Sequence, residues 1–436
     1  MRSTRKHPLS ILRYAAVFLA TLGFSFWFVA EASQQSPGPG ERHHDEEEGG
    51  EAFPEPAAQG ETPCRGGSAG GYPCKDVDLL SFMPLSEIGG EGGAHGADIW
   101  GWTDPANGRE YAVMALSTGT SFVDITNPTD PVYLGLLPTQ SVPSPWRDVK
   151  VYKNHAFIVS EAASHGMQIF NLKQLGRVTG PPVTFSSTAQ YAGQGLSTSH
   201  NIAINEKTGF AYIVGTNTCA GGLHMVNIKK PKSPKFAGCY SGDGYTHDAQ
   251  CVVYRGPDSA HSGSEICFNA NEDTLTIVDV SNKNNPRMLS RTSYPGVAYT
   301  HQSWTTEDQL YLLSDDELDE RTEGNRTKTF VWDIVDLNAP QLIGTYTGKK
   351  KAIDHNLYIR DGFAYQANYQ SGLRILDLKN IADGRLTEVA FFDIFPEGNQ
   401  ARFNGAWSNY PYFPSGVVIV SGIEQGLFVL HPHLPR

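Results

Sequence analysis

The sequence has few charged residues and lacks the motifs of common nucleotide-dependent enzymes. Charged residues make up 18% of its 436 residues, and the net charge of −12 makes nucleic acid an unsuitable partner. It contains no phosphate-binding loop and no dinucleotide fingerprint, which argues against a nucleotide cofactor. It also has no Cys-x-x-Cys pair, which disfavours a cysteine-based zinc site.

The composition favours an all-β fold. Hydrophobic residues make up 39% of the chain, aromatic residues 11%, and there are 45 glycines, which suits many short strands joined by tight turns. A length of 436 residues is compatible with one large all-β domain.

The N-terminal segment is typical of an exported protein. Basic residues precede an apolar run from Tyr14 to Ala30, so residues 1–32 are expected to be a signal peptide or an uncleaved signal anchor. Residues 33–62, rich in Pro, Gly and Glu, are predicted to be a disordered acidic linker before a domain at 63–436. We expect an extracytoplasmic location, which means secreted, periplasmic or on the cell surface. Any membrane attachment is expected to come from the N-terminal segment.

Six cysteines in an exported chain favour disulfides. Sequence alone allows 15 connectivities. We expect the three local pairs because two of them bracket segments that are predicted to be adjacent antiparallel strands. The expected pairs are Cys64 with Cys74, Cys219 with Cys239, and Cys251 with Cys267.

One unit recurs along the domain: an apolar strand ending in Asp or Asn, a turn, and a second strand. Seven copies occur at intervals of 41 to 57 residues, which fits a four-stranded propeller blade. The residues taken as equivalent are Asp124, Asn171, Asn227, Asp279, Asp336, Asp377 and His431. The last copy lacks a fourth strand, and Val77–Pro84 resembles the missing one. The sequence therefore predicts a seven-bladed β-propeller closed by an N-terminal strand, without an open sheet edge.

A second repeat precedes each copy and contains histidine in four consecutive units. Because the innermost strand of each blade lines the channel of a propeller, residues at its start are expected to form a ring at one mouth. The histidines are His200, His247, His301 and His355; the candidate neighbours in other units are His95, Asp98, Arg147, Asp148 and Asp248.

Three roles for these histidines stay open. Converging imidazoles are the usual ligands of Zn, Cu or Fe, and Asp or Asn completes or orients such sites. A ring without metal would bind a small polar ligand. In the third role, each histidine holds a turn to its own blade by hydrogen bonds.

Two further features are candidates for function. The loop 314–320 carries five carboxylates, which suits Ca²⁺, although a solvated acidic loop explains the same composition. These residues are Asp315, Asp316, Glu317, Asp319 and Glu320. Aromatic residues near the ring motifs either wall a ligand pocket or pack the blades; they include Trp100, Trp102, Trp146, Trp304, Trp407, Tyr410 and Tyr412.

The motifs together resemble the choice-of-anchor B family of exported proteins, which are built from LVIVD repeats. The resemblance covers about residues 64–431 and rests on segments such as VDLLSFMPLSEIGG, DIWGWTDP, GTSFVDITNP, YTHDAQC, YTHQSW, DDELDE and IDHNLY. It implies propeller-like repeats and export, and it implies no particular reaction.

Three functions follow from these expectations. The first is an exported or surface binding protein that holds a metal-dependent or small polar ligand, or a protein partner, at the histidine face. The second is a metal-dependent enzyme, oxidative or hydrolytic, with an open coordination position. The third is a metal-free structural or adhesion scaffold.

Overall fold

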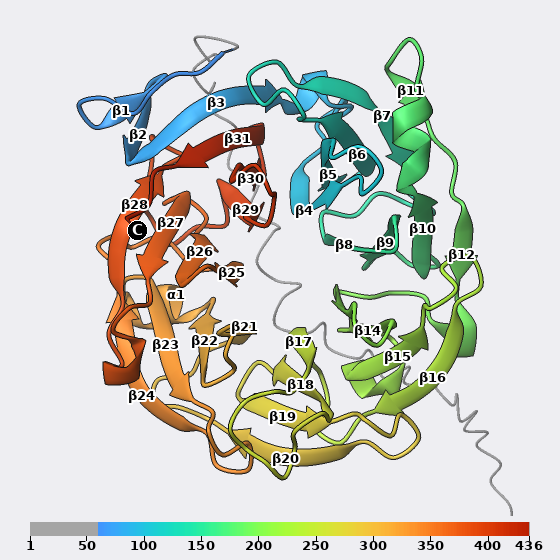
Figure 1. Ribbon diagram of the computed structural model, residues 1–436, viewed down its shortest axis with the longest axis vertical. Helices are drawn as coiled ribbons and strands as arrows, with labels where there is room; N and C mark the ends of the chain where they lie inside the picture. Colours follow the sequence, from blue (N-terminus) through green and yellow to red (C-terminus); the bar gives the residue numbers. More distant parts are fainter. Residues whose placement is uncertain (1–59, 436) are drawn as a thin grey trace, which may run out of the picture. The chain divides into compact units, whose positions relative to one another are not determined.

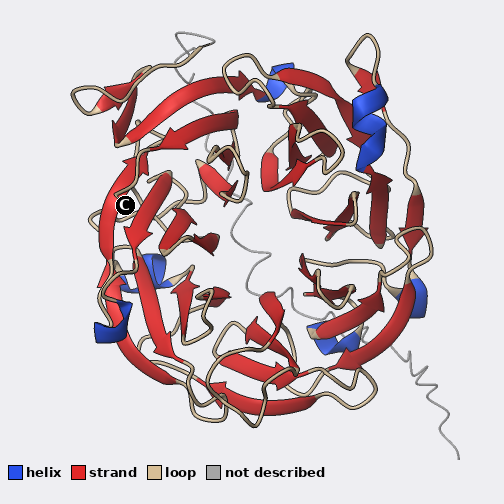
Figure 2. Cartoon of the chain, viewed as in Figure 1, coloured by secondary structure: helices blue, strands red, loops and turns tan. Residues whose placement is uncertain are grey.

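The computed structural model describes residues 60–435, which form seven mainly antiparallel sheets arranged as the blades of a β-propeller (Figures 1 and 2). The predicted fold class is confirmed. The predicted signal segment and nearly all of the predicted linker lie outside the described residues.

Each blade has four main strands, which follow one another from the channel outward. The first four blades are β4 (Gly96–Thr103), β5 (Glu110–Leu116), β6 (Gly119–Asp124) and β7 (Val132–Pro138); β8 (Arg147–Tyr152), β9 (His155–Ser160), β10 (Met167–Asn171) and β12 (Ala189–Tyr191); β13 (Asn201–Asn205), β14 (Phe210–Val214), β15 (Leu223–Asn227) and β16 (Lys235–Tyr240); and β17 (Asp248–Val253), β18 (Glu265–Ala270), β19 (Leu275–Asp279) and β20 (Arg287–Thr292). The last three are β21 (Thr300–Thr305), β22 (Tyr311–Asp316), β23 (Lys328–Asp333) and β24 (Gln341–Thr347); β25 (Leu357–Arg360), β26 (Phe363–Ala367), β27 (Leu373–Asp377) and β28 (Thr387–Phe392); and β29 (Ala406–Tyr410), β30 (Val418–Gly422), β31 (Gly426–Pro432) and β3 (Val77–Pro84).

Short strands and helical turns connect or extend the blades. They are β1 (Ser68–Ala69), β2 (Tyr72–Lys75), β11 (Val183–Thr184), the helix α1 (Asp319–Glu323), and the 3₁₀ turns η2 (Leu85–Glu87), η3 (Leu172–Arg177), η4 (Gly193–Gly195), η5 (Cys219–Gly221) and η6 (Ile381–Asp383).

The hydrophobic core lies between neighbouring blades. In β19, Leu275 and Ile277 pack toward the next blade, while Val278 packs toward the preceding one. Successive strand residues point to opposite faces, so adjacent apolar residues of one strand contribute to two interfaces at once. This is why the third strands carry adjacent apolar residues such as Ile277 and Val278.

The Asp or Asn that ends the third strand closes a turn in six of the blades. Its side-chain oxygen accepts a hydrogen bond from the backbone N–H two residues on, at 2.8–3.1 Å. Such turns explain why the repeat selects these two residue types. In the fifth blade the residue is Asp333, because β23 ends there and Asp333 Oδ1 accepts from Val335 N; the predicted equivalence of Asp336 is wrong by three residues.

The strand Val77–Pro84 is the outer strand of the last blade. It pairs antiparallel with β31, with Leu79 opposite Leu430 and Met83 opposite Leu427. In Figure 1, β3 therefore lies beside the C-terminal strands β29–β31, although it comes early in the chain. This is the pairing that the repeat pattern predicts.

All three predicted disulfides are present: Cys64–Cys74, Cys219–Cys239 and Cys251–Cys267. Cys251 and Cys267 lie directly opposite each other on β17 and β18. Cys219 lies in the turn η5 rather than on a strand, and it reaches Cys239 on β16. Disulfides are typical of oxidising compartments. In residues 60–435, no helix has the length and apolar character needed to cross a membrane.

A glycine at a bulge of the outer strand is expected to be essential for blade packing. A Cβ on Gly238 of β16 would lie 1.8 Å from the carbonyl oxygen of Lys283, and that backbone belongs to the next blade. Gly238→Ala is therefore expected to lower the free energy of unfolding by about 3 kcal/mol, measured by urea denaturation.

Ser290 provides the matched control for this substitution. It stands at the corresponding bulge of β20 and already carries a Cβ. Ser290→Ala is therefore expected to change stability by less than about 1 kcal/mol. Equal stability of Gly238→Ala and the parent protein would contradict the close approach of the two blades.

Candidate metal centre and channel

The four histidines lie side by side at one mouth of the channel. Each stands at the start of an inner strand: before β13, before β17, within β21 and just before β25. Neighbouring ring centroids are 4.3, 4.2 and 4.3 Å apart along the series His200, His247, His301 and His355. We call this series the histidine row.

The partners of the Nδ1 atoms orient the rings. His247 Nδ1 lies 2.8 Å from the carbonyl oxygen of His301, and His355 Nδ1 bonds to the carbonyl oxygen of Trp407. A carbonyl oxygen only accepts hydrogen bonds, so Nδ1 carries the proton in both rings and Nε2 carries the lone pair. Metal-binding histidines are commonly oriented in this way.

Carboxylates flank two other rings of the row. His200 Nδ1 pairs with Glu161, and His301 Nδ1 lies 3.5 Å from Asp315 Oδ1. Each of the four imidazoles therefore has an oxygen atom near Nδ1.

Glu317 faces the middle of the histidine row. Its Oε1 lies 3.9 Å from His301 Nε2 and 3.6 Å from His355 Nε2, and it accepts a hydrogen bond from the Tyr369 hydroxyl at 2.7 Å. His247, His301 and Glu317 each offer one ligand atom, and these atoms all lie within 4.8 Å of one another. The four histidines do not converge on one point; two of them and Glu317 do. We call these three residues the His–Glu cluster.

Burial controls the charge of this cluster. It lowers the pKa of His247 and of His301 well below the usual value, and repulsion from neighbouring imidazoles lowers both further. Burial also raises the pKa of Glu317 to about 7, although the Tyr369 hydrogen bond opposes this. Two neutral imidazoles are thus available as ligands at neutral pH, because a metal binds only the unprotonated nitrogen.

His200 differs from its neighbours. Burial alone would lower its pKa, but the adjacent Glu161 outweighs burial and raises it. The protonated form of His200 is therefore favoured by Glu161, which lies beside it at the end of the histidine row.

The predicted carboxylate neighbours form a separate polar layer on the inner strands. Lys150 Nζ lies 2.9 Å from Asp98 Oδ2 and 2.5 Å from Asp148 Oδ1. Asp248 Oδ2 accepts a hydrogen bond from Gln302 Nε2 at 2.9 Å. We call these five residues the charged layer; its contacts join inner strands of neighbouring blades.

In this layer, Lys150 is the cation that pairs with both Asp98 and Asp148. Burial raises the pKa of Asp148, and Lys150 offsets this only in part. For Asp98, Lys150 and hydrogen bonds outweigh burial and lower the pKa. Burial would lower the pKa of Lys150, but the two carboxylates raise it well above its usual value. Lys150 therefore stays charged although it is almost fully enclosed.

Two predicted neighbours do not contribute to the His–Glu cluster. Arg147 is buried, bonds to Thr139 Oγ1 at 2.6 Å and lies 3.3 Å from His165 Nε2. His95 is exposed in the loop before β4. The positive charge of Arg147 and the solvent around His95 make neither suited to complete a metal site with the row.

The acidic loop is not one site, and it is not a solvated loop. Asp315 and Asp316 are buried and accept backbone hydrogen bonds from Gln302 and from Ala298 and Tyr299, respectively. Glu317 belongs to the His–Glu cluster. Asp319 and Glu320 are buried with Asp354, which the sequence pattern did not identify, and their ligand atoms lie within 4.8 Å.

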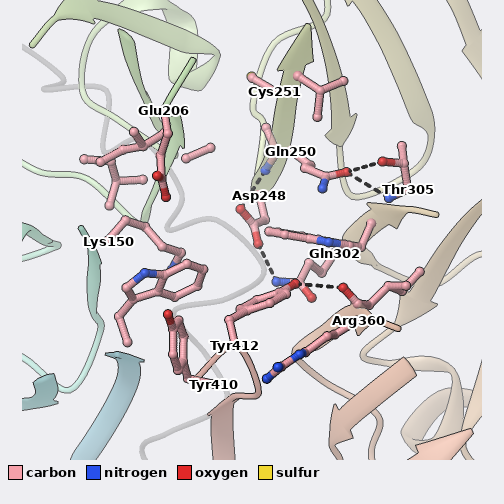
Figure 3. A pocket seen from close by; sticks show the side chains of 18 of the residues that line it. Lys150, Glu206, Asp248, Gln250, Cys251, Gln302, Thr305, Arg360, Tyr410 and Tyr412 are labelled. Carbon is pink, nitrogen blue, oxygen red and sulfur yellow. Dashed lines mark hydrogen bonds between the residues drawn. The ribbon is translucent and has the colours of Figure 1, made fainter. Parts of the chain in front are cut away.

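The channel beyond the charged layer contains a cavity of about 420 Å³, which we call the channel pocket (Figure 3). Residues from all seven inner strands line it. Among the aromatic residues near the ring motifs, Trp100, Trp304, Tyr410 and Tyr412 line the pocket, whereas Trp102 and Trp407 pack into the core between blades.

Comparison with known proteins supports the repeat architecture. The LVIVD repeat model matches residues 267–293, which include β19 and β20. Together with the seven blades, this match fits a family of propeller-repeat proteins. A search of curated proteins found no match to the chain.

Proposed function

We propose that this protein is an exported binding protein of the choice-of-anchor B type, which holds a transition-metal ion at the histidine face of its propeller. The single observation that carries the proposal is the His–Glu cluster. Its two imidazoles are neutral, and its three ligand atoms lie within 4.8 Å of one another.

The donor set indicates which ions fit. Two imidazoles and one carboxylate are the ligands of many zinc and non-haem iron sites, and imidazole also suits copper. Three protein ligands leave coordination positions open, so a bound ion would attract a small polar or anionic ligand there. The Tyr369 hydroxyl donates its hydrogen to Glu317 and would hold that carboxylate in place beside a bound ion.

Export is part of the same proposal. Three disulfides, the predicted signal segment and the resemblance to exported proteins support an extracytoplasmic location. The ligand would then be an extracellular or periplasmic compound.

Elemental analysis of purified protein tests the proposal. We expect about one equivalent of Zn, Fe or Cu per chain, lost on dialysis against a chelator and regained on adding the metal back. Calcium measured in the same sample tests the separate cluster at Asp319, Glu320 and Asp354. A chain that neither contains nor takes up a transition metal would contradict the proposal and favour a structural scaffold.

A metal-dependent reaction is a second candidate, favoured by the open coordination positions of the same three-ligand set. Turnover of a simple ester, or oxygen consumption with an added reductant, would then follow metal content. Metal binding without either activity would support a binding function and argue against a metal-dependent reaction.

A further inference from the structure

The channel pocket lies on the other side of the charged layer from the histidine row. The inner strands of successive blades run in the same direction, so residues at their ends lie at the mouth opposite the histidines. Glu206 follows β13, Glu307 follows β21, and Arg360 ends β25. Glu206 and Glu307 are exposed, so the pocket opens to solvent at this second mouth.

The walls of the pocket are aromatic. Trp100 and Tyr410 meet edge to face with ring centroids 5.0 Å apart, and Tyr412 lies 6.2 Å from Trp100. Trp304 is also part of the lining. Lys150 Nζ lies 4.8 Å from the centroid of the Trp100 ring, so this wall already contacts one ammonium group. Aromatic faces attract cations more strongly when water is excluded.

The positive charges of the pocket are already neutralised. Lys150 contacts Asp98 and Asp148 in the charged layer. Arg360 pairs with Asp361 and donates to the backbone oxygens of Pro411 and Phe413.

The negative charges are not neutralised to the same extent. Among the described residues, Glu206 makes no hydrogen bond and no ion pair, although it lines the cavity, and Figure 3 shows it across the pocket from Arg360. Within residues 60–435, Glu307 accepts one hydrogen bond, from the backbone N–H of Asp361. The pocket therefore presents aromatic walls and a surplus of negative charge.

We propose that the channel pocket binds a small organic cation, an amine or quaternary ammonium compound with an apolar body. The ammonium group contacts Glu206 and the faces of the aromatic walls, and the apolar body fills the space among Trp100, Trp304 and Tyr410. A volume of about 420 Å³ accommodates a ligand of this size. The inference is independent of the proposed metal, because it uses different residues at the opposite mouth.

Calorimetric titration with matched probes tests this inference. Benzyltrimethylammonium and benzylamine are the cationic probes, benzyl alcohol is the neutral probe, and benzoate is the anionic one. We expect the cations to bind at least about tenfold more tightly than benzyl alcohol, and benzoate to bind more weakly still.

Variants locate the binding site of the cations. Glu206→Gln keeps the shape of the side chain and is expected to weaken cation binding about tenfold while leaving benzyl alcohol unchanged. Because Glu206 is exposed and unpaired, this variant is expected to fold normally. Glu87→Gln, which removes an exposed acid on η2 outside the pocket, is the matched control and is expected to bind like the parent protein.

Three outcomes would overturn the inference: equal affinity for cation and alcohol, unchanged cation affinity in Glu206→Gln, or binding of a neutral sugar such as cellobiose in preference to the cations. The titrations are repeated on chelator-treated protein and on His301→Ala. If both samples bind the cations as the parent protein does, cation binding does not depend on the proposed metal site. This inference would then hold even when no metal is found in the protein.

Discussion

His301→Ala is expected to lower the affinity for the bound transition metal by at least about 100-fold. His301 is one of the two inner rings of the histidine row, and it belongs to the cluster whose ligand atoms lie within 4.8 Å of one another. Loss of a residue that only orients a ligand typically costs about 10-fold to 100-fold, so loss of a ligand itself is expected to cost more. Competition with a chromophoric chelator measures the change.

The control for this prediction is another histidine outside the row. His155 begins β9, is partly exposed and bonds through Nδ1 to the carbonyl oxygen of Lys153. His155→Ala is expected to keep the parent affinity. If both variants bind metal equally well, the ion is held elsewhere and the proposed centre is wrong.

Lys150→Met is expected to lower the free energy of unfolding by about 3–5 kcal/mol, because removing one partner of a buried ion pair leaves the other charge without compensation. Lys150 is the one cation between Asp98 and Asp148, and all three groups are enclosed by the inner strands. Chemical denaturation at neutral pH measures the loss.

A compensated variant separates charge from packing in this prediction. Lys150→Met combined with Asp98→Asn and Asp148→Asn removes all three charges and is expected to recover most of the stability. A compensated variant as unstable as the single variant would mean that the lysine side chain contributes by packing alone.

The loss of stability in Lys150→Met is expected to depend on pH, and the direction of this dependence follows from the pKa of Asp98. The pKa of Asp98 is lowered in the folded protein, because Lys150 and hydrogen bonds outweigh burial. Its contribution to stability is therefore fully present above its unfolded pKa of about 3.9 and is lost as the pH falls below that value. The difference between Lys150→Met and the parent is expected to shrink on acidification, and a constant difference would contradict the assigned ion pair.

The sequence predicted the histidine row well because its members occupy the same place in four successive repeats. It did not identify Glu317 as their partner. That residue is part of an acid-rich segment whose composition suggested a calcium loop, whereas the fold divides the segment among three places. The only signal was that the segment overlaps the end of β22, the second strand of the blade that carries His301.

The repeat alignment was wrong at one position, in the fifth repeat, because two aspartates there have the same turn-forming chemistry. The fifth repeat contains both Asp333 and Asp336, and the repeat alignment used the second. Both side chains accept a hydrogen bond from the N–H two residues on, so both form turns. The strand ends at Asp333 because its neighbour β22 pairs with β23 only as far as Tyr311, which lies opposite Asp333. Strand pairing, rather than turn chemistry, decides the boundary.

The sequence by itself determined the number of blades, the closing strand and the gathering of the four histidines at one mouth of the channel. Each of these depends on a pattern that recurs along the chain, and recurrence places equivalent residues at equivalent positions of a ring. Only the tertiary structure decided that His247 and His301 meet Glu317, that Asp354 joins Asp319 and Glu320, and that seven inner strands enclose the channel pocket. These contacts join side chains from different blades, and their direction depends on strand bulges and ring orientation, which periodicity does not encode.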